Sequence, residues 1–373
     1  MSSLRTVQVV NVRWFNATAW YGLELARLLK AAGHESRVLA LADTETFAKA
    51  ESMGLNPLAM PLNATNPLEL PGLLRDMHRF IHDFRPNVVN CHRGESFLFW
   101  GLLKRSGGYA LVRTRGDQRL PKGNLPNRLL HTRVADAVVA TNSVMARHFA
   151  TAMSVPAERL YTILGGVDTA RFHYDAEGRA RVRARYGFTD DECVVGLLGR
   201  FDRVKGQRET LAALARLVNG GVRHIRLLLL GFSTATLQEE VEAWIREAGM
   251  ERYVTITGKV DDVTACLSAL DVGVVASLWS ETIARAALEI MACGRPLVST
   301  SVGVMPDLLP ASALVSPGDV AALAEVLRRA ATDEAWRREL AEICTKRIAT
   351  LRDSDFLAST LEVYEAALHR VRT

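Results

Sequence analysis

The chain of 373 residues carries a formal net charge of +5, with 49% hydrophobic and 23% charged residues, which are ordinary values for a globular protein. Its length exceeds what a single hydrophobic core usually serves, so two domains are expected. No apolar stretch reaches the roughly 20 residues that span a bilayer, and the N-terminal MSSLRTVQVVNV has too short an apolar stretch for a signal peptide and predicts a first strand.

The first half of the chain alternates short β-branched runs with helical patterns. Predicted strands cover residues 6–12, 34–42, 87–91, 109–117 and 135–143, and predicted helices cover residues 20–32, 68–84, 97–105 and 144–153. Ser96 and Ser143 are expected to cap the last two of these helices. Repeated β-α units of this kind predict a parallel, doubly wound sheet.

Residues 160–192 lose this periodicity, are rich in charge and contain a Gly-Gly turn, which predicts an interdomain linker. The alternation then restarts. Strands are predicted at residues 193–200, 225–231 and 253–258, and helices at 206–218, 237–249, 263–270, 319–331, 334–349 and 355–368. The expected architecture is α/β, with two Rossmann-like halves of similar size.

The positive charge lies in the first half. Residues 1–170 hold 20 Lys and Arg against 13 Asp and Glu, whereas the remainder holds 26 against 28. Between Lys104 and Arg133 there are eight basic residues and one acid, Asp117. This half is suited to an anionic partner such as a membrane surface, a phosphorylated glycolipid or nucleic acid, and a merely solvated basic surface is equally open. The five cysteines are scattered without Cys-x-x-Cys pairs, as in a reduced cytosolic protein.

Residues 271–300 combine a buried strand, a polar elbow, a helical stretch and a second strand, with Glu281 at the elbow and Glu289 within the helical stretch. Eight helical residues separate two side chains by roughly 12 Å along the axis and about 80° around it. Paired glycosidase carboxylates lie roughly 5 to 9.5 Å apart, so these two are interpreted as anchors for one elongated, hydroxyl-rich ligand. The alternative, a solvated Glu289 and a Glu281 that favours a helix start, is equally open.

A second polar group follows the strand at residues 193–200. Arg200 ends that strand, and Lys205-Gly206 opens the next helix. A helix N-terminus, a close backbone approach at glycine and two cations suit a diphosphate. Neither GxxxxGK[ST] nor GxGxxG occurs. Together with the two glutamates in the same half, these residues predict binding of a nucleotide-diphosphate sugar.

These motifs resemble those of the retaining GT-B glycosyltransferases of family 4, also called group 1. Glu281 and Glu289 match the family's Glu-x7-Glu motif and are followed by MACGRPLVST, and GRFDRVKG resembles its donor loop. LGGVDTARF, GHESRV and RPNVVNCH resemble further family segments, in order along the chain. The resemblance implies a GT-B fold, in which two Rossmann-like domains with parallel sheets face each other across a cleft. Residues 1–170 would form the acceptor-binding domain and residues 171–354 the donor-binding domain, with the last helix, 355–373, packing back on the first.

The resemblance also implies roles for individual residues. Arg200 and Lys205 would bind the donor diphosphate and stabilise the leaving group, which makes a metal or other cofactor unnecessary. Glu281 would hold the donor sugar, Glu289 the ribose hydroxyls, and His92 would reach the sugar from the first domain. As an isolated residue, His92 is more often a structural hydrogen bonder than a ligand contact. The remaining donor contacts implied are Gly206, Thr282, Ile283, Lys259 and Val260.

The expected reaction is transfer of a sugar from a UDP- or GDP-sugar, with retention, to a glycan or lipid-linked glycan. Synthesis of cell-surface polysaccharide or lipopolysaccharide is the expected setting, in the cytoplasm or on the inner face of the cytoplasmic membrane. Residues 16–22 lack the family's usual glycine pair, and Thr282-Ile283-Ala284 replaces its Gly-Phe-Gly. Acceptor geometry and donor-sugar preference are therefore not carried over.

Two rival functions are considered. One is a GT-B-like nucleotide-sugar epimerase or hydrolase, which would convert the donor without an acceptor. The other is a non-catalytic protein that binds nucleotide sugars or nucleic acid. Nucleic-acid binding is disfavoured because only Tyr109 is interleaved with the basic residues 104–133. The Asp-Ser-Asp at 353–355 is interpreted as a helix cap rather than a metal site.

Overall fold

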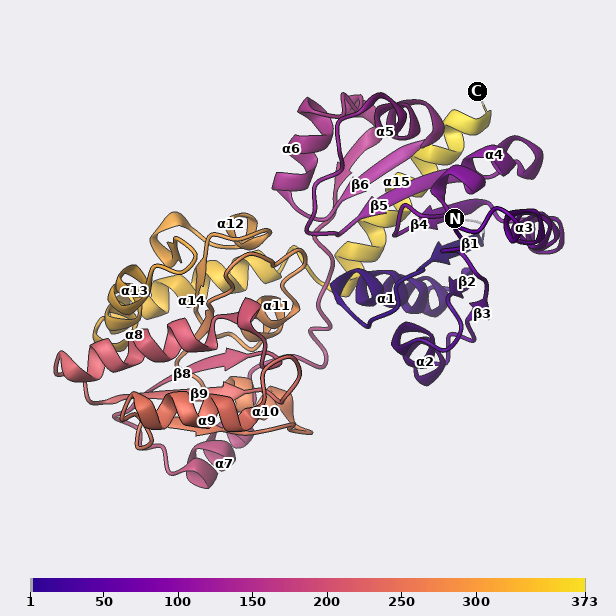
Figure 1. Ribbon diagram of the computed structural model, residues 1–373. Helices are drawn as coiled ribbons and strands as arrows, with labels where there is room; N and C mark the ends of the chain where they lie inside the picture. Colours follow the sequence, from indigo (N-terminus) through magenta and orange to yellow (C-terminus); the bar gives the residue numbers. More distant parts are fainter. Residues whose placement is uncertain (1–2, 373) are drawn as a thin grey trace. The chain divides into compact units, whose positions relative to one another are not determined.

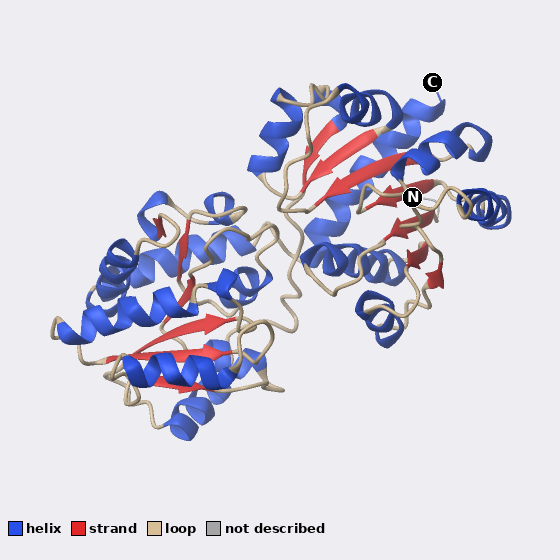
Figure 2. Cartoon of the chain, viewed as in Figure 1, coloured by secondary structure: helices blue, strands red, loops and turns tan. Residues whose placement is uncertain are grey.

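The computed structural model describes residues 3–372, which divide into two compact units. Unit 1 contains residues up to Gly165 and those from Asp353 on, and unit 2 contains Gly166–Arg352. The boundaries predicted from the sequence lay after residues 170 and 354. Each unit is a parallel sheet with helices on both faces (Figures 1 and 2).

Unit 1 is built on a seven-stranded sheet in the order β3-β2-β1-β4-β5-β6-β7, with every pair parallel. The strands are β1 (Arg5–Val9), β2 (Glu35–Ala40), β3 (Leu58–Ala59), β4 (Val88–Cys91), β5 (Ala110–Arg115), β6 (Ala137–Ala140) and β7 (Leu160–Thr162). The order runs outward in opposite directions from β1 and β4. Their carboxyl ends therefore form the switch point at which ligands bind in open α/β sheets.

Helices cover both faces of this sheet. They are α1 (Ala17–Ala31), α2 (Glu45–Ser52), α3 (Leu70–Phe84), α4 (Phe97–Gly107), α5 (Leu125–Leu129) with the π-helical turn η1 (Leu130–Val134), α6 (Ser143–Thr151), the 3₁₀ turn η2 (Ala157–Arg159) and α15 (Asp353–Arg372). The larger core lies between the sheet and α3, α4 and α6, where Met77, Trp100 and Phe149 are fully buried. A second core joins the sheet to α1 and α2.

The C-terminal helix α15 packs on unit 1 across the strands (Figure 1). The hydroxyl of Tyr364 accepts hydrogen bonds from Gln8 Nε2 and Asn90 Nδ2, both at 3.1 Å. Near the end of the helix, Arg370 donates to the carbonyl oxygens of Asp136 and Glu158. Because these partners come from β1, β4 and the segments beside β6, the helix is fixed at several strands of the sheet.

Unit 2 repeats the arrangement with six parallel strands in the order β10-β9-β8-β11-β12-β13. The strands are β8 (Cys193–Leu198), β9 (Ile225–Leu230), β10 (Val254–Ile256), β11 (Val272–Val275), β12 (Leu297–Thr300) and β13 (Leu314–Val315). Its helices are α7 (Ala176–Tyr186), α8 (Gln207–Asn219), α9 (Gln238–Glu247), α10 (Val263–Ser268), α11 (Arg285–Ala292), α12 (Met305–Leu308), α13 (Val320–Thr332) and α14 (Glu334–Ile348), with 3₁₀ turns η3 (Arg203–Lys205) and η4 (Ala311–Ala313). The switch point lies between β8 and β11.

The predicted linker at residues 160–192 was wrong in extent, because β7 and α7 lie within it. Helix α7 has no apolar stripe for a sequence pattern to reveal. It is held by two arginines instead: Arg179 and Arg183 form ion pairs with Asp271 at 2.8 and 3.0 Å. Arg179 also donates to the carbonyl oxygens at the end of α10.

Of the two predicted serine caps, Ser143 was wrong and Ser96 was right in position only. At α6 the capping side chain is Asn142, whose Oδ1 accepts from Met145 N at 2.9 Å, so Ser143 is the first helical residue. Ser96 occupies the N-cap position of α4, but its side chain makes no capping hydrogen bond. The Asp-Ser-Asp segment opens α15, where Asp353 forms an ion pair with Arg27 at 3.0 Å.

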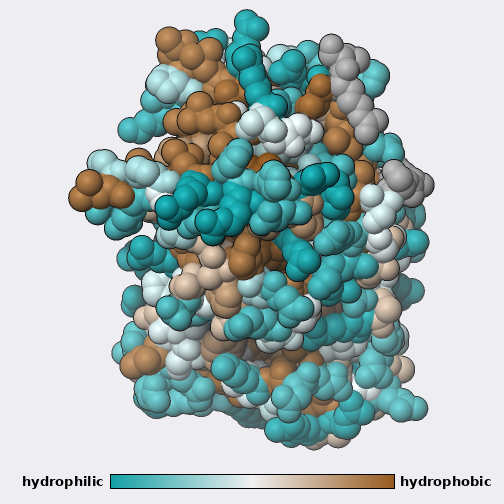
Figure 3. Space-filling model, turned by 90° about the vertical axis from the view of Figure 1, so that its right-hand side faces the viewer, coloured by the Kyte–Doolittle hydropathy of each residue, from teal (hydrophilic) through white to brown (hydrophobic). Residues whose placement is uncertain are grey.

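The side of unit 1 that carries α3 and α4 is mostly hydrophilic, with hydrophobic residues gathered toward its top (Figure 3). Helix α4 contributes two exposed leucines, Leu98 and Leu102. Over residues 3–372, no helix combines the length and apolar character needed to cross a membrane. All five cysteines are buried as free thiols.

Candidate functional site

Two predicted residues meet at the switch point of unit 2. Lys205 closes the loop after β8, Glu281 lies in the loop after β11, and Lys205 Nζ is 2.5 Å from Glu281 Oε1. Ser277 Oγ donates to the same carboxylate oxygen at 2.6 Å. The side chain of Glu281 is 8% exposed and that of Lys205 is 24% exposed. A nearly buried carboxylate thus holds the ammonium group of a partly accessible lysine.

Two glycines allow the loops to approach this closely. Gly206 has φ +69°, and a Cβ there would lie 2.0 Å from the carbonyl oxygen of Ala276. Gly303 has φ +60°, and its Cβ would lie 1.9 Å from the carbonyl oxygen of Glu281. Both positions exclude any side chain, because the added atom would overlap backbone. The loops after β8, β11 and β12 are therefore packed backbone against backbone around Lys205 and Glu281.

Arg200 lies on the open side of this group. Its side chain is 49% exposed and forms an ion pair with Asp202 at 2.9 Å. Its carbonyl oxygen accepts from Gln207 Nε2 at 2.8 Å, which ties the loop to the first turn of α8. The guanidinium is accessible to an anion, as is Lys205, and Gly206 lies at the N-terminus of α8.

The predicted spacing of the two glutamates was wrong. Helix α11 begins only at Arg285, and its N-cap, Ala284, has a left-handed φ of 53°. Glu281, Thr282 and Ile283 therefore precede the helix, and Ile283 is buried. The residues between the two glutamates form a loop and one helical turn, so the separation expected for eight helical residues does not apply.

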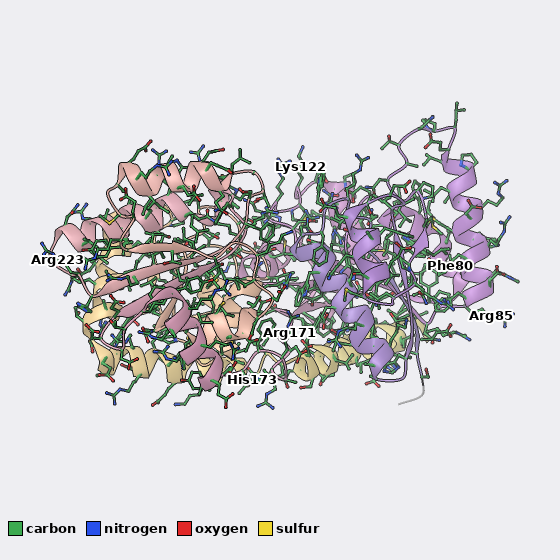
Figure 4. The ribbon with its side chains drawn as sticks, turned by 90° about the horizontal axis from the view of Figure 1, so that it is seen from below. Phe80, Arg85, Lys122, Arg171, His173 and Arg223 are labelled. Carbon is green, nitrogen blue, oxygen red and sulfur yellow. The ribbon has the colours of Figure 1, made fainter. Side chains whose placement is uncertain are left out.

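Glu289 lies on α11 and has two arginine neighbours that the sequence analysis missed. Arg285, one turn earlier, donates from Nη2 to Glu289 Oε1 at 3.1 Å. Arg171, on the segment that leads to α7 (Figure 4), contributes a second positive charge. Burial raises the pKa of the Glu289 carboxyl above its ordinary value, and the two arginines oppose this rise. A spacing of i, i+4 on a helix was the available signal for Arg285.

Lys259 and Val260 follow β10, next to an aromatic residue that follows β9. Lys259 Nζ lies 4.8 Å from the ring centroid of Phe232, and that side chain is 40% exposed. An exposed ring at the carboxyl ends of β9 and β10 offers a surface on which a planar base can stack. The position of Phe232, directly after the strand and Gly231, was the signal for it in the sequence.

In unit 1, His92 follows β4 directly and is 1% exposed. Its Nε2 lies 3.0 Å from Gln8 Oε1, and its Nδ1 has no hydrogen-bond partner among residues 3–372. Burial, aided by the charge of Arg113, lowers the pKa of His92 to about 3, so the ring is neutral at physiological pH. Because Gln8 Oε1 accepts, the proton is assigned to Nε2, which leaves Nδ1 as an acceptor.

Metal ligands do not gather in the described part of the chain. No group of three or more His, Cys, Asp or Glu side chains there is arranged to hold an ion. The polar groups at the unit 2 switch point are cations beside one carboxylate.

Two protein-family models together match most of the chain. Residues 192–333 match "Glycosyl transferases group 1", and residues 18–171 match "Glycosyltransferase Family 4". A D-inositol 3-phosphate glycosyltransferase of Pseudarthrobacter chlorophenolicus is 27% identical over 382 residues, covering 94% of this chain and 90% of that protein. A 2-deoxystreptamine glucosyltransferase of Streptomyces kanamyceticus is 31% identical over 193 residues, and that match covers only 50% of this chain and 46% of the relative.

Solved structures share the fold over nearly the full length. A glycosyltransferase from Rickettsia africae superposes with a TM-score of 0.86 at 16% identity, covering 99% of each chain. Anabaena Alr3699/HepE in complex with UDP and glucose superposes with a TM-score of 0.78 at 18% identity, covering 97% of this chain and 100% of that one. The chain thus belongs to the group 1, or family 4, glycosyltransferases, a retaining family with the GT-B fold.

Proposed function

We propose that this glycosyltransferase takes its sugar from a UDP-sugar, or failing that a GDP-sugar, and binds it in unit 2. The observation that carries the proposal is the contact between Lys205 and Glu281 at the β8–β11 switch point, with Arg200 accessible beside it. UDP is favoured because the structural relative from Anabaena was solved with UDP and with UDP-glucose. Cell-surface polysaccharide or lipopolysaccharide synthesis is the proposed setting, and a lipopolysaccharide galactosyltransferase shares the fold.

The roles follow from the charges. Lys205 and Arg200 bind the diphosphate, helped by the N–H groups at the start of α8, and stabilise its charge as the bond to the sugar breaks. Lys205 then leaves Glu281, whose carboxylate accepts hydrogen bonds from hydroxyls of the donor sugar. Glu289 accepts from the ribose hydroxyls, and the loop with Thr282 and Ile283 borders the sugar. Phe232, with the Lys259-Val260 segment, contacts the base.

Retention follows when the acceptor attacks from the face that the diphosphate leaves. The bond from the anomeric carbon to the diphosphate oxygen breaks, and the bond to the acceptor oxygen forms. The acceptor's proton passes to the departing phosphate oxygen, so the products are the glycoside and the nucleoside diphosphate. No protein nucleophile is required. His92 is the residue of unit 1 proposed to contact the sugar, and its neutral Nδ1 can accept a hydrogen bond from a hydroxyl once the surrounding side chains move.

The donor site is tested by calorimetry with UDP, GDP and ADP in the presence of EDTA, for the wild type and Glu289→Ala. We expect UDP to bind and the substitution to weaken binding about 10-fold, because one charged hydrogen bond contributes roughly 1.5 kcal/mol. If no nucleotide binds, the donor site is refuted. Turnover of a UDP-sugar without acceptor, at the rate seen with acceptor, would favour the epimerase or hydrolase instead. Nucleotide-sugar binding without turnover in any acceptor screen would favour the non-catalytic reading.

The acceptor is proposed to be a glycan or lipid-linked glycan that unit 1 binds, with the protein in the cytoplasm and on the inner face of the cytoplasmic membrane. The support is a surface around α5, here the α5 patch. It combines the exposed leucines Leu120, Leu125 and Leu129 with the exposed cations Arg119, Lys122, Arg128 and Arg133. Lys122 lies on the surface of unit 1 (Figure 4). Leucines among cations suit an anionic membrane surface.

Vesicle sedimentation tests this membrane contact. The double variant Lys122→Glu/Arg128→Glu should lose binding to vesicles containing phosphatidylglycerol, whereas Arg79→Glu on α3 should retain it. Binding to neutral phosphatidylcholine vesicles should be weak for all three proteins. Equal binding of wild type and double variant would remove the α5 patch as the contact.

A further inference from the structure

Arg113, on β5, is a cation inside unit 1 without an anionic partner of its own. It is 1% exposed, and its Nη1 donates to the carbonyl oxygens of Cys91 at 2.7 Å and Thr114 at 2.6 Å. Its Nη2 has no hydrogen-bond partner in the described part of the chain. Burial, with repulsion from Arg115, lowers the pKa of Arg113 to about 10, so the group remains charged at neutral pH. A buried charge without a partner is destabilising, so we infer that Arg113 is retained for a function.

Two more arginines lie beside it, and the nearby acids do not balance them. Arg93 Nε donates to both Oε atoms of Glu95 at 3.2 Å, and Arg93 Nη1 lies 3.5 Å from Asp117. Arg115 Nη2 is 3.8 Å from Asp117, and its buried Nε is unpartnered within residues 3–372. Three cations face two carboxylates, and Asp117 is shared between Arg93 and Arg115. The cluster therefore keeps one positive charge in excess, centred on Arg113.

The backbone next to the Arg113 guanidinium is the turn that precedes α4. A Cβ at Gly94 would lie 3.8 Å from Arg113 Nη2, and the Phe97 ring lies 5.9 Å from the guanidinium carbon. Between them, Ser96 is fully buried, and its Oγ has no partner among the residues described. Arg113 Nη2 is thus unpaired beside Gly94 in the turn before α4, and the unpaired Ser96 hydroxyl lies at the N-cap of this 11-residue helix. This combination favours an anion with several oxygens.

A pocket at the carboxyl ends of β1, β2 and β3 is linked to the cluster by the hydrogen bonds of Asn11. Asn11, which follows β1, lies 3.5 Å from Glu95 through Nδ2 and also donates to Asn63 Oδ1 at 2.6 Å. Asn63 lines the pocket, which has a volume of about 590 Å³ and includes Arg13, Asp43 and Thr44 in its wall. The volume suits a small ligand, and the wall offers both hydrogen-bond donors and acceptors.

We propose that the acceptor carries a phosphoryl group, that Arg113, Arg93 and Arg115 bind this group, and that the rest of the acceptor occupies the neighbouring pocket. This rests on the proposed function, because it names the acceptor class of the same enzyme. The phosphoryl group replaces Glu95 at Arg93 and reaches Arg113 Nη2 when the Arg93 and Glu95 side chains turn aside. A phosphate monoester with about −1.5 to −2 charges compensates the excess positive charge better than a hydroxyl does.

The test uses calorimetry on the full chain with UDP present at saturation, so that the donor site is filled. Three probes are compared: inorganic phosphate, glucose 6-phosphate and glucose. We expect glucose 6-phosphate to bind more tightly than phosphate, and glucose to bind much more weakly than either. Arg93→Gln should weaken both phosphorylated probes about 10-fold and Arg113→Lys by about 10-fold or more, as for the loss of a charged hydrogen bond. Arg79→Gln, an exposed arginine on α3, is the matched control and should change nothing.

Each outcome decides one point. Unchanged binding of the phosphorylated probes in both Arg93→Gln and Arg113→Lys, or no binding of either probe to the wild type, overturns the phosphoryl site while UDP binding stands. Arg93 is partly exposed, so its variant stays informative if Arg113→Lys fails to fold. Failure of UDP to bind refutes the donor proposal separately. Vesicles with phosphatidic acid distinguish the source: Arg113-dependent binding to them indicates a lipid phosphate, and its absence a soluble one.

Discussion

The Lys205–Glu281 contact makes a prediction that links stability to donor binding. With Lys205→Met, the apolar stem stays beside Gly199 while the ammonium group is lost, and Glu281 keeps the hydrogen bond from the Ser277 hydroxyl. Breaking a fully buried ion pair by removing one partner costs about 3–5 kcal/mol. Lys205 is 24% exposed, so solvent screens part of this interaction, and we expect a loss of about 2 kcal/mol. Glu281→Gln should lower the stability less, because an amide oxygen still accepts hydrogen bonds from Lys205 and Ser277.

A double-mutant cycle of these two substitutions isolates the pair. In urea unfolding of the free protein, we expect a coupling free energy of about 1–2 kcal/mol. With saturating UDP, Lys205 moves to the diphosphate, so the coupling free energy between positions 205 and 281 should fall. Coupling below about 0.5 kcal/mol in the free protein would show that the pair is not an energetic unit. Coupling that UDP leaves unchanged would refute the exchange of partners.

Further predictions concern α11 and the loop before α8. Because burial raises the pKa of Glu289 and the ribose hydroxyls need an ionised acceptor, UDP binding should fall as the pH drops through that raised pKa. Arg285→Gln removes a positive charge that lowers the pKa of Glu289, so the loss of UDP binding should move to higher pH. Calorimetry across a pH series measures this shift. An unchanged pH profile would exclude Glu289 as the titrating group. Gly206→Ala should unfold at clearly lower urea and lose UDP binding, since its Cβ overlaps the carbonyl oxygen of Ala276. Gly221→Ala, also at positive φ but with open space, should lose only about 1 kcal/mol; equal losses at both glycines would contradict the steric explanation.

Most strands and most helices were predictable because their signals are local, whereas the short strands β3, β7 and β13 were not predicted. β-branched runs such as Val272–Val275 need burial on both faces, and the periodicity of residues 68–84 matches α3 within two residues at its start. Helix α7 was missed for an equally local reason. It binds Asp271 and nearby carbonyl oxygens through arginines, and arginines in sequence are indistinguishable from a solvated surface.

The sequence predicted which residues belong to the candidate site, but not which of them contact each other. Lys205 and Glu281 are 76 positions apart, and their pairing exists because β8 and β11 are neighbours in the sheet while β9 and β10 lie on the other side. The αL backbone at Ala284 also moved the start of α11 away from Glu281. The resemblance to a known family placed these residues in one site. The sheet order explains why they touch.

The basic stretch 104–133 shows most clearly what only the tertiary structure decided. In sequence it is one run of positive charge. In the fold, Arg113 lies inside unit 1 on β5, Lys104 forms an ion pair with Asp136 at 2.5 Å, and the cations around α5 remain exposed among leucines. Composition alone determined that this half is cationic. The direction in which each side chain leaves its strand or helix determined which charges face solvent and which one is buried without a counterion.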